Sequence, residues 1–125
     1  MINRDERQRF IREWLLRTFG PLNATSTERY KRFLEEAIEL VQTGLPIGET
    51  IKIVSYVYSK PVGEVKQEIG GVSLALLALC ESLNISAEDT ESDELNRIIF
   101  TIPEVFQKKH NLKVEAGIAQ PIIKG

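Results

Sequence analysis

The chain has 125 residues, a length that fits one domain rather than two. Its 42% hydrophobic and 27% charged residues are an ordinary globular balance, which excludes an intrinsically disordered chain. The net charge of −2 gives no broad basic field, so we expect no stable nucleic-acid partner.

Apolar residues recur at helical spacing between breaks at Gly and Pro, which predicts an all-α fold. The first helix is expected at Asp5–Phe19. The second is expected at Ser26–Thr43, where Thr25 and Glu28 fit a capping box. A third is expected around Gly48–Tyr58, with a strand as the weaker alternative because Val and Ile are dense there.

The second half of the chain predicts two further helices and a tail. The fourth helix is expected to start at Pro61 and to end near Asn84, which tolerates the left-handed conformation. Because it is apolar on every side from Ile69 onward, it should be the most buried helix. A fifth helix should start at Ser92 and be kinked or split by Pro103. Residues 111–125 lose the helical pattern and are expected to form an extended tail.

Three features predict a cytoplasmic protein with no membrane span. The chain has one cysteine, Cys80, and so no intramolecular disulfide, which suits a reducing compartment. Its first residues are polar and lack the apolar core of a signal peptide. The longest uncharged stretch, Ile69–Cys80, is well short of the roughly 20 residues that a spanning helix needs.

The strongest local motif is Glu35-Glu36-x-x-Glu39 in the second expected helix. Residues three and four apart are neighbours on a helix surface, so these carboxylates should lie side by side. Carboxylate oxygens are the ligands that Mg²⁺ prefers, which makes the motif a candidate metal site. The plainer alternative is a solvated face with ion pairs from Lys31 to Glu35 and from Arg32 to Glu36.

A second acidic motif leads into the apolar fourth helix. Glu64 and Glu68 are one turn apart, and Gly70 and Gly71 follow directly. Each helical glycine costs about 1 kcal/mol relative to Ala, which indicates close approach of a partner helix or a ligand. The alternative is that the two glutamates are only helix-start residues that the helix dipole favours.

The two motifs occur together with a Tyr-Ser-Lys-Pro-Val-Gly-Glu segment and a Gln-Glu-Ile-Gly-Gly-Val segment, all within Glu28–Ile85. In this combination the chain resembles MazG-like pyrophosphohydrolases, and more narrowly the phage-associated, MazZ-type subgroup that acts on dATP and dGTP. The resemblance implies a helical bundle in which the second and fourth helices form an antiparallel acidic pair. It also implies a single domain over residues 1–125, with its core in 5–110 and its tail in 111–125.

The resemblance assigns roles to single residues. Three positions match the metal ligands of the family: Glu36, Glu39 and Glu68. Glu35 matches the helper glutamate that orients the attacking water. The family has a fourth ligand, an aspartate, at the position of Gly71, so this chain lacks that carboxylate. Our hypothesis is that Glu64 or a water supplies the missing oxygen to two or three Mg²⁺ ions, for which Mn²⁺ can substitute.

The implied reaction converts a nucleoside triphosphate into a monophosphate and pyrophosphate, with dGTP and then dATP as expected substrates. Four residues are candidates for substrate binding, each with ordinary surface or core packing as the alternative: Arg32, Lys60, Lys66 and Trp14. We expect a homo-oligomer, a dimer or a tetramer, because one chain covers the fourth helix poorly. If a phage encodes the chain, its compartment would be the host cytoplasm.

Three other functions are compatible with the sequence. One is a housecleaning hydrolase for non-standard nucleotides. Another is a non-catalytic helical module for oligomerisation or partner binding, which Gly71 favours. The third is a nucleic-acid adaptor that uses the arginines of the first helix.

The only histidine, His110, lies near a helix end and is expected to be structural rather than catalytic.

Overall fold

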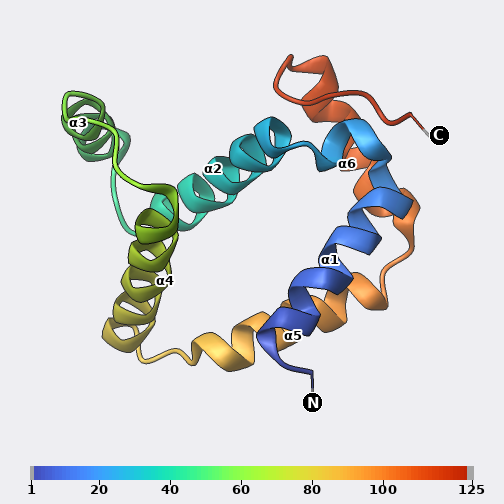
Figure 1. Cartoon of the computed structure of the whole chain (residues 1–125), viewed down its shortest axis with the longest axis horizontal. Coiled ribbons are helices and arrows are strands. Elements are labelled where there is room, and N and C mark those ends of the chain that lie inside the picture. Colours follow the sequence, from blue (N-terminus) through green and yellow to red (C-terminus); the bar gives the residue numbers. More distant parts are fainter. Residues whose placement is uncertain (1, 124–125) are drawn as a thin grey trace. The chain divides into compact units, whose positions relative to one another are not determined.

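The computed structural model describes residues 2–123. Over this range the chain is all-α, with six α-helices, one 3-10 helix and no strand, as the sequence predicted (Figure 1). The helices are α1 (Arg4–Phe19), η1 (Pro21–Ala24), α2 (Ser26–Gln42), α3 (Ile47–Tyr58), α4 (Val65–Ser82), α5 (Ala87–Ile99) and α6 (Pro103–Glu115).

The chain divides into two compact units. One contains Met1–Gly44 and Ile102–Gly125, and so includes α1, η1, α2 and α6. The other is Leu45–Thr101, with α3, α4 and α5. The two acidic motifs therefore belong to different units, and the single domain expected from the sequence stays a prediction.

Local caps fix the ends of the first two helices. Asn3 caps α1 by accepting a hydrogen bond from the Glu6 amide at 2.9 Å. The helix ends at Gly20, whose φ of 82° lies in the left-handed region that favours glycine. Thr25 then caps α2 through the Glu28 amide at 3.4 Å, as predicted. Both helices match the expected ranges to within one residue at each end.

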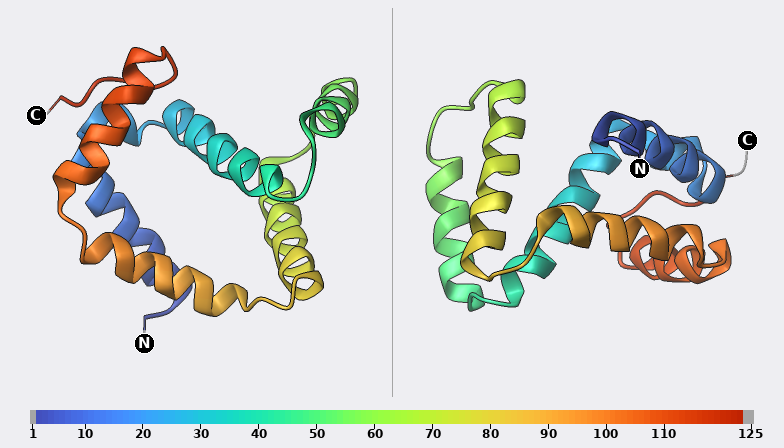
Figure 2. Two further views of the ribbon diagram at one scale, coloured as in Figure 1. Left: turned by 180° about the vertical axis from the view of Figure 1, so that it is seen from behind. Right: turned by 90° about the horizontal axis from the view of Figure 1, so that it is seen from below.

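Packing of α6 on α1 forms the core of the first unit, and the two helices lie side by side (Figure 2). Leu15 and Phe19 of α1 are its buried hydrophobic residues. The ring of Trp14 meets Phe19 and Phe106 edge-on, with centroids 5.5 and 5.2 Å apart. The ring of His110 lies 4.8 Å from that of Phe19, so the aromatic residues join the two helices.

The fourth helix starts later than the sequence predicted. It begins at Val65, and Pro61 lies outside it. The reason is the cap at Glu64, whose carboxylate accepts a hydrogen bond from the Gln67 amide at 2.9 Å. Gly63 before it also disfavours helical backbone. The expected end is confirmed, because Asn84 adopts a φ of 56° just after the helix.

The expectation that α4 would be the most buried helix is wrong for this chain. None of its residues, all of which the structure describes, is buried. Ile69 and Leu74 are 62% and 69% exposed. An apolar composition shows that burial of a helix would be favourable. It does not show which part of the chain, if any, covers that helix. The weaker strand alternative for the third element is also wrong, since α3 is a regular helix.

The C-terminal elements differ from the prediction in two ways. First, α5 begins at Ala87 rather than at Ser92, because Ser86 caps it by accepting from the Asp89 amide at 3.1 Å. Pro103 does split the helix, since it opens α6 at a position that needs no amide donor. Second, α6 continues to Glu115, so the tail expected from residue 111 starts after the helix. Residues 124–125 of that tail lie outside the described range.

Within residues 2–123, no single helix is long and apolar enough to cross a membrane. The helices α4 and α5 meet the length and composition only as a pair, and that pair is bent by 104° (Figure 1).

Candidate functional site

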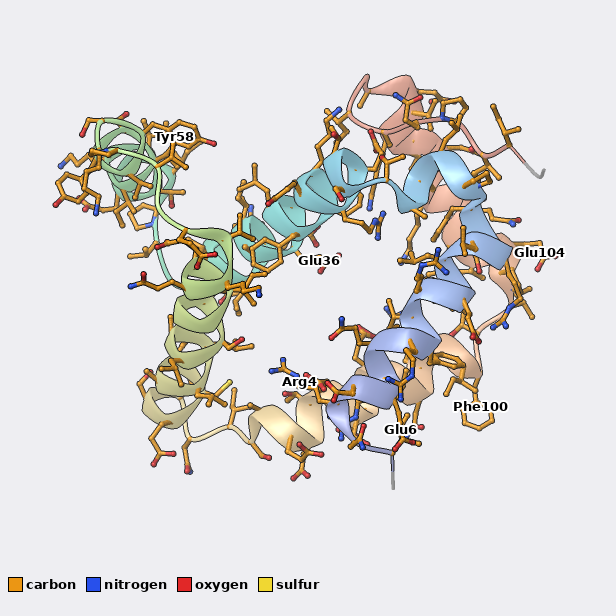
Figure 3. The ribbon with its side chains drawn as sticks, viewed as in Figure 1. Arg4, Glu6, Glu36, Tyr58, Phe100 and Glu104 are labelled. Carbon is orange, nitrogen blue, oxygen red and sulfur yellow. The ribbon has the colours of Figure 1, made fainter. Side chains whose placement is uncertain are left out.

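The first acidic motif lies on the middle and second half of α2. Glu36 and Glu39 are exposed, whereas Glu35 is half-buried. Figure 3 shows Glu36 projecting from the helix. Helical spacing therefore presents the three carboxylates as predicted, with one of them sheltered by the rest of its unit.

Two cations hold the sheltered carboxylate. The Nζ atom of Lys113 lies 3.1 Å from Oε1 of Glu35, and Nη1 of Arg32 lies 3.6 Å from the same oxygen. The Glu35 side chain is 24% exposed and that of Arg32 is 11% exposed, so solvent screens these ion pairs only in part. The arrangement keeps one buried oxygen of Glu35 between two positive charges, without a hydrogen bond of regular geometry to either cation.

Two ion pairs along α2 join residues three positions apart. Lys31 pairs with Glu28, at 3.5 Å, and Arg32 pairs with Glu35. The other end of the Arg32 guanidinium donates from Nη2 to the carbonyl of Ile118. Burial, and then the charge of Arg32, lowers the pKa of the Arg29 guanidinium, while Glu28 acts in the opposite direction.

Glu28 has a larger role than the expected capping box gave it. Its residue is 2% exposed, and its carboxylate accepts a hydrogen bond from the Gln120 amide at 3.3 Å. The Gln120 carbonyl lies 2.8 Å from Nε2 of His110, which is itself buried. Glu28 and His110 thus hold both backbone groups of one C-terminal residue, and the structural role expected for the histidine stays a prediction.

The second acidic motif lies at the start of α4, in the other unit. Glu64 stands at the N-cap rather than within the helix, and its carboxylate is engaged with the Gln67 amide. The Glu68 side chain folds back over Gly63, where an added Cβ would lie 2.8 Å from its Oε1. The helix N-terminus favours both negative charges, as the plainer interpretation of this motif expected.

The two glycines after Glu68 do not meet a partner within this chain. At Gly70 and at Gly71, an added Cβ would have no atom within 4 Å among the described residues. The two glycines were expected to allow a partner helix or a ligand to approach closely. No described part of this chain makes such an approach.

The described residues contain no group of three or more His, Cys, Asp or Glu side chains that could hold a metal ion together. The expected ligands Glu36 and Glu39 belong to one unit, and Glu68, with Glu64, belongs to the other. The expected ligands are thus divided between the two units. Their joint coordination of Mg²⁺ stays a prediction.

The other predicted substrate-binding residues have separate positions. Lys60 extends over the ring of Tyr56, with Nζ 4.9 Å from the centroid. Lys66 is exposed in the first turn of α4. Trp14 takes the core-anchor position within the aromatic contacts between α1 and α6. Lys113 was not among the predicted site residues, because its only signal in the sequence was a lysine in a segment expected to be a tail.

Comparison of the chain with protein families, with curated proteins and with solved structures finds no match. The resemblance of Glu28–Ile85 to MazG-like enzymes stays a prediction from the motifs alone.

Proposed function

We propose that the chain is a Mg²⁺-dependent pyrophosphohydrolase of purine deoxynucleoside triphosphates, with dGTP and dATP as substrates. The observation that supports the proposal most directly is that the three glutamates of the α2 motif have different surroundings. Glu36 and Glu39 are exposed and so accessible to a metal ion, while Oε1 of Glu35 lies between Lys113 and Arg32. The plainer alternative also expected ion pairs on this face, so it is the partial burial of Glu35 that favours the proposal.

In this proposal Glu36, Glu39 and Glu68 hold the metal ions, and Glu35 orients water. Bound Mg²⁺ would neutralise charge on the triphosphate and lower the pKa of the attacking water. Glu35 would accept the proton of that water as it attacks the α-phosphorus. The bond from the α-phosphorus to the bridging oxygen breaks, and the products are a nucleoside monophosphate and pyrophosphate.

The finer architecture is part of the same proposal. A MazG-like bundle would pair α2 with α4, so that both acidic motifs share one site. A homo-oligomer, dimer or tetramer, would cover the apolar side chains that the single chain leaves exposed. Leu74 on α4 and Ile51 on α3, which are 69% and 56% exposed, are the kind of residue that such an assembly buries.

A product assay tests the function. The purified chain is incubated with each dNTP, with Mg²⁺ or with chelator, and the products are separated by ion exchange. We expect monophosphate and pyrophosphate only with metal, and a loss of about 100-fold or more in kcat for Glu36→Gln. Glu81→Gln, which removes an exposed carboxylate from the far end of α4, is the matched control.

Other products would separate the alternatives. Release of single phosphate would show that a different bond is cut and would reject the proposed reaction. Turnover of modified nucleotides but not of dGTP or dATP would support the housecleaning alternative.

A non-catalytic helical module is the second candidate, and two observations favour it. Gly71 offers no ligand atom where the family has an aspartate, and apolar residues are exposed along α3 and α4. Mg²⁺ separates the two candidates, because a ligand that binds only the folded state raises the unfolding temperature by mass action. An enzyme should be stabilised by Mg²⁺ or Mn²⁺, whereas a bare scaffold should not respond to either ion.

A further inference from the structure

The contact between Lys113 and Glu35 joins two helices that are distant in the sequence. Lys113 lies in the last turn of α6, and its Nζ reaches Oε1 of Glu35 on α2 at 3.1 Å. The side chains are 29% and 24% exposed, so neither is freely solvated. A partly sheltered ion pair is screened less by salt than a surface pair and holds its geometry better.

Glu35 is held from two directions. Arg32, one turn before it on α2, approaches the same Oε1 at 3.6 Å. The Arg32 guanidinium is itself fixed, since Nη2 donates to the Ile118 carbonyl just beyond α6. Within the described residues, the ion pairs of Glu35 all converge on Oε1. One buried oxygen of the carboxylate therefore lies between the two cations, held by charge rather than by a hydrogen bond of regular geometry.

The segment after α6 keeps Lys113 in place. Its first turn includes Gly117, whose φ of 78° reverses the chain after the helix. Gln120 is then tied by its amide to Glu28 and by its carbonyl to His110. The Asn23 side chain, fully buried, donates to the Pro121 carbonyl at 3.2 Å. Polar contacts on both sides of Lys113 thus fix the end of α6 against α2 and its preceding turn.

From this geometry we propose that Lys113 is a positioning residue, which holds the Glu35 carboxylate in the orientation that it needs to direct the attacking water. The inference rests on the proposed function and adds a residue from α6 to its site. Lys113 acts through Glu35 and need not touch the nucleotide. A general base works only within hydrogen-bond reach of its proton, so a displacement of about 1 Å is expected to slow the reaction greatly.

Kinetics of Lys113 variants test the role. We expect Lys113→Gln to lower kcat by roughly tenfold or more while KM changes by less than about twofold, because the lost contact positions Glu35 and does not bind substrate. Lys113→Arg, which keeps the charge, should recover most of kcat. Lys109→Gln is the matched control, since Lys109 lies one turn earlier on α6 and is exposed. A rise in KM at unchanged kcat would assign Lys113 to substrate binding and overturn the proposal.

A double-mutant cycle tests the contact without using activity. Thermal unfolding is compared for the intact chain, Lys113→Gln, Glu35→Gln and the double variant. We expect Lys113→Gln to lower the unfolding temperature by about 2 °C in the intact background and by much less when Glu35 is already neutral. Additive shifts would show that the two side chains do not interact and would overturn the proposal.

The two readouts also separate this inference from the proposed function. If the intact chain hydrolyses no dNTP, the proposed function fails, and the positioning role fails with it even where the cycle shows coupling. If the intact chain is active but the cycle is additive, only the role of Lys113 fails. Activity together with coupling and a selective loss of kcat is the combination that upholds the proposal.

Discussion

Gly63 determines where the Glu68 carboxylate can lie. An added Cβ at this position would come within 2.8 Å of Oε1 and 3.2 Å of Cδ of Glu68. The obstructing atoms are at the flexible end of a side chain, so the side chain can move away at little cost in stability. The glycine thus leaves space for one particular carboxylate rotamer at the start of α4.

We predict that Gly63→Ala weakens metal binding without unfolding the chain. The displaced Glu68 carboxylate should reduce Mn²⁺ affinity by about tenfold, as loss of outer-shell support commonly does. The free energy of unfolding without metal should change by less than about 0.5 kcal/mol. Calorimetric titration with Mn²⁺ and urea unfolding are the measurements, and Gly48→Ala, where a Cβ meets nothing within 4 Å, is the control. Unchanged Mn²⁺ affinity in Gly63→Ala would argue that Glu68 is not a ligand.

At the scale of elements, the start of α4 combines two roles in one residue. Glu64 caps the helix through the Gln67 amide, and it is also our candidate for the oxygen that Gly71 does not provide. A carboxylate can do both only if one oxygen remains for the metal. The two roles respond differently to substitution, because serine caps helices well but is a poor ligand for Mg²⁺.

We predict that Glu64→Ser and Glu64→Ala will separate capping from metal binding. Glu64→Ala should lower the free energy of unfolding by about 1 kcal/mol, while Glu64→Ser should nearly preserve it. If Glu64 is a ligand, both variants should weaken Mn²⁺ binding to a similar extent. Urea unfolding and calorimetric titration measure the two effects. Normal Mn²⁺ affinity in Glu64→Ser would leave the cap as the only role of this residue.

The segment after α6 is a second element that can be tested. The end of α1 at Gly20 lies directly against it, because an added Cβ on this residue would overlap the Ile123 carbonyl oxygen. Gly20 also has a φ of 82°, which a residue with a Cβ adopts only at a cost. The C-terminal segment is thus packed on a backbone position that only glycine can occupy.

We predict that Gly20→Ala destabilises the first unit and releases this segment. The left-handed backbone alone should cost about 1–2 kcal/mol, and the overlap with Ile123 adds to it. Urea unfolding gives the loss of stability, and limited proteolysis after α6 reports release of residues 116–123. Gly48→Ala again serves as the control, because it adds a methyl group in open space. Equal protease resistance in both variants would contradict the packing described here.

At the scale of the whole molecule, a single chain leaves many large apolar side chains uncovered. Among the described residues only Leu15 and Phe19 are buried hydrophobic residues. Tyr58 and Phe100, which Figure 3 shows extending from their segments, are 86% and 85% exposed. Such exposure is unusual for a stable monomer and is the physical basis for expecting an assembly.

We predict that Leu74→Glu shifts the chain toward monomer. A charge in the buried core of an interface is costly, so the dissociation constant of the oligomer should rise by tenfold or more, equivalent to about 1.4 kcal/mol. Size-exclusion chromatography with light scattering measures the mass. Val62→Glu, in the loop before α4 and 99% exposed, is the control that should leave it unchanged. A monomeric intact chain would reject the homo-oligomer instead.

The sequence by itself determined the helical class of this protein and most helix ends. These depend on neighbours within about four residues: a cap such as Asn3 or Thr25, a proline such as Pro103, or a left-handed residue such as Asn84. Side-by-side placement of the α2 glutamates follows from the same local geometry. The predicted helix bounds were wrong at the start of α4, where Pro61 and Glu64 were competing start signals. They were also wrong in α6, where the helix continues through polar residues.

Only the tertiary structure decided which of these residues meet. Glu35 is paired with a lysine 78 positions later, and Glu28 with the backbone of a residue 92 positions later. Such contacts depend on how the chain closes on itself, and no spacing along the sequence encodes them. The burial of Asn23 and the exposure of α4 were hidden for the same reason. The residue type determines which interactions a side chain can form. The packing of the chain determines which neighbours are close enough to form them.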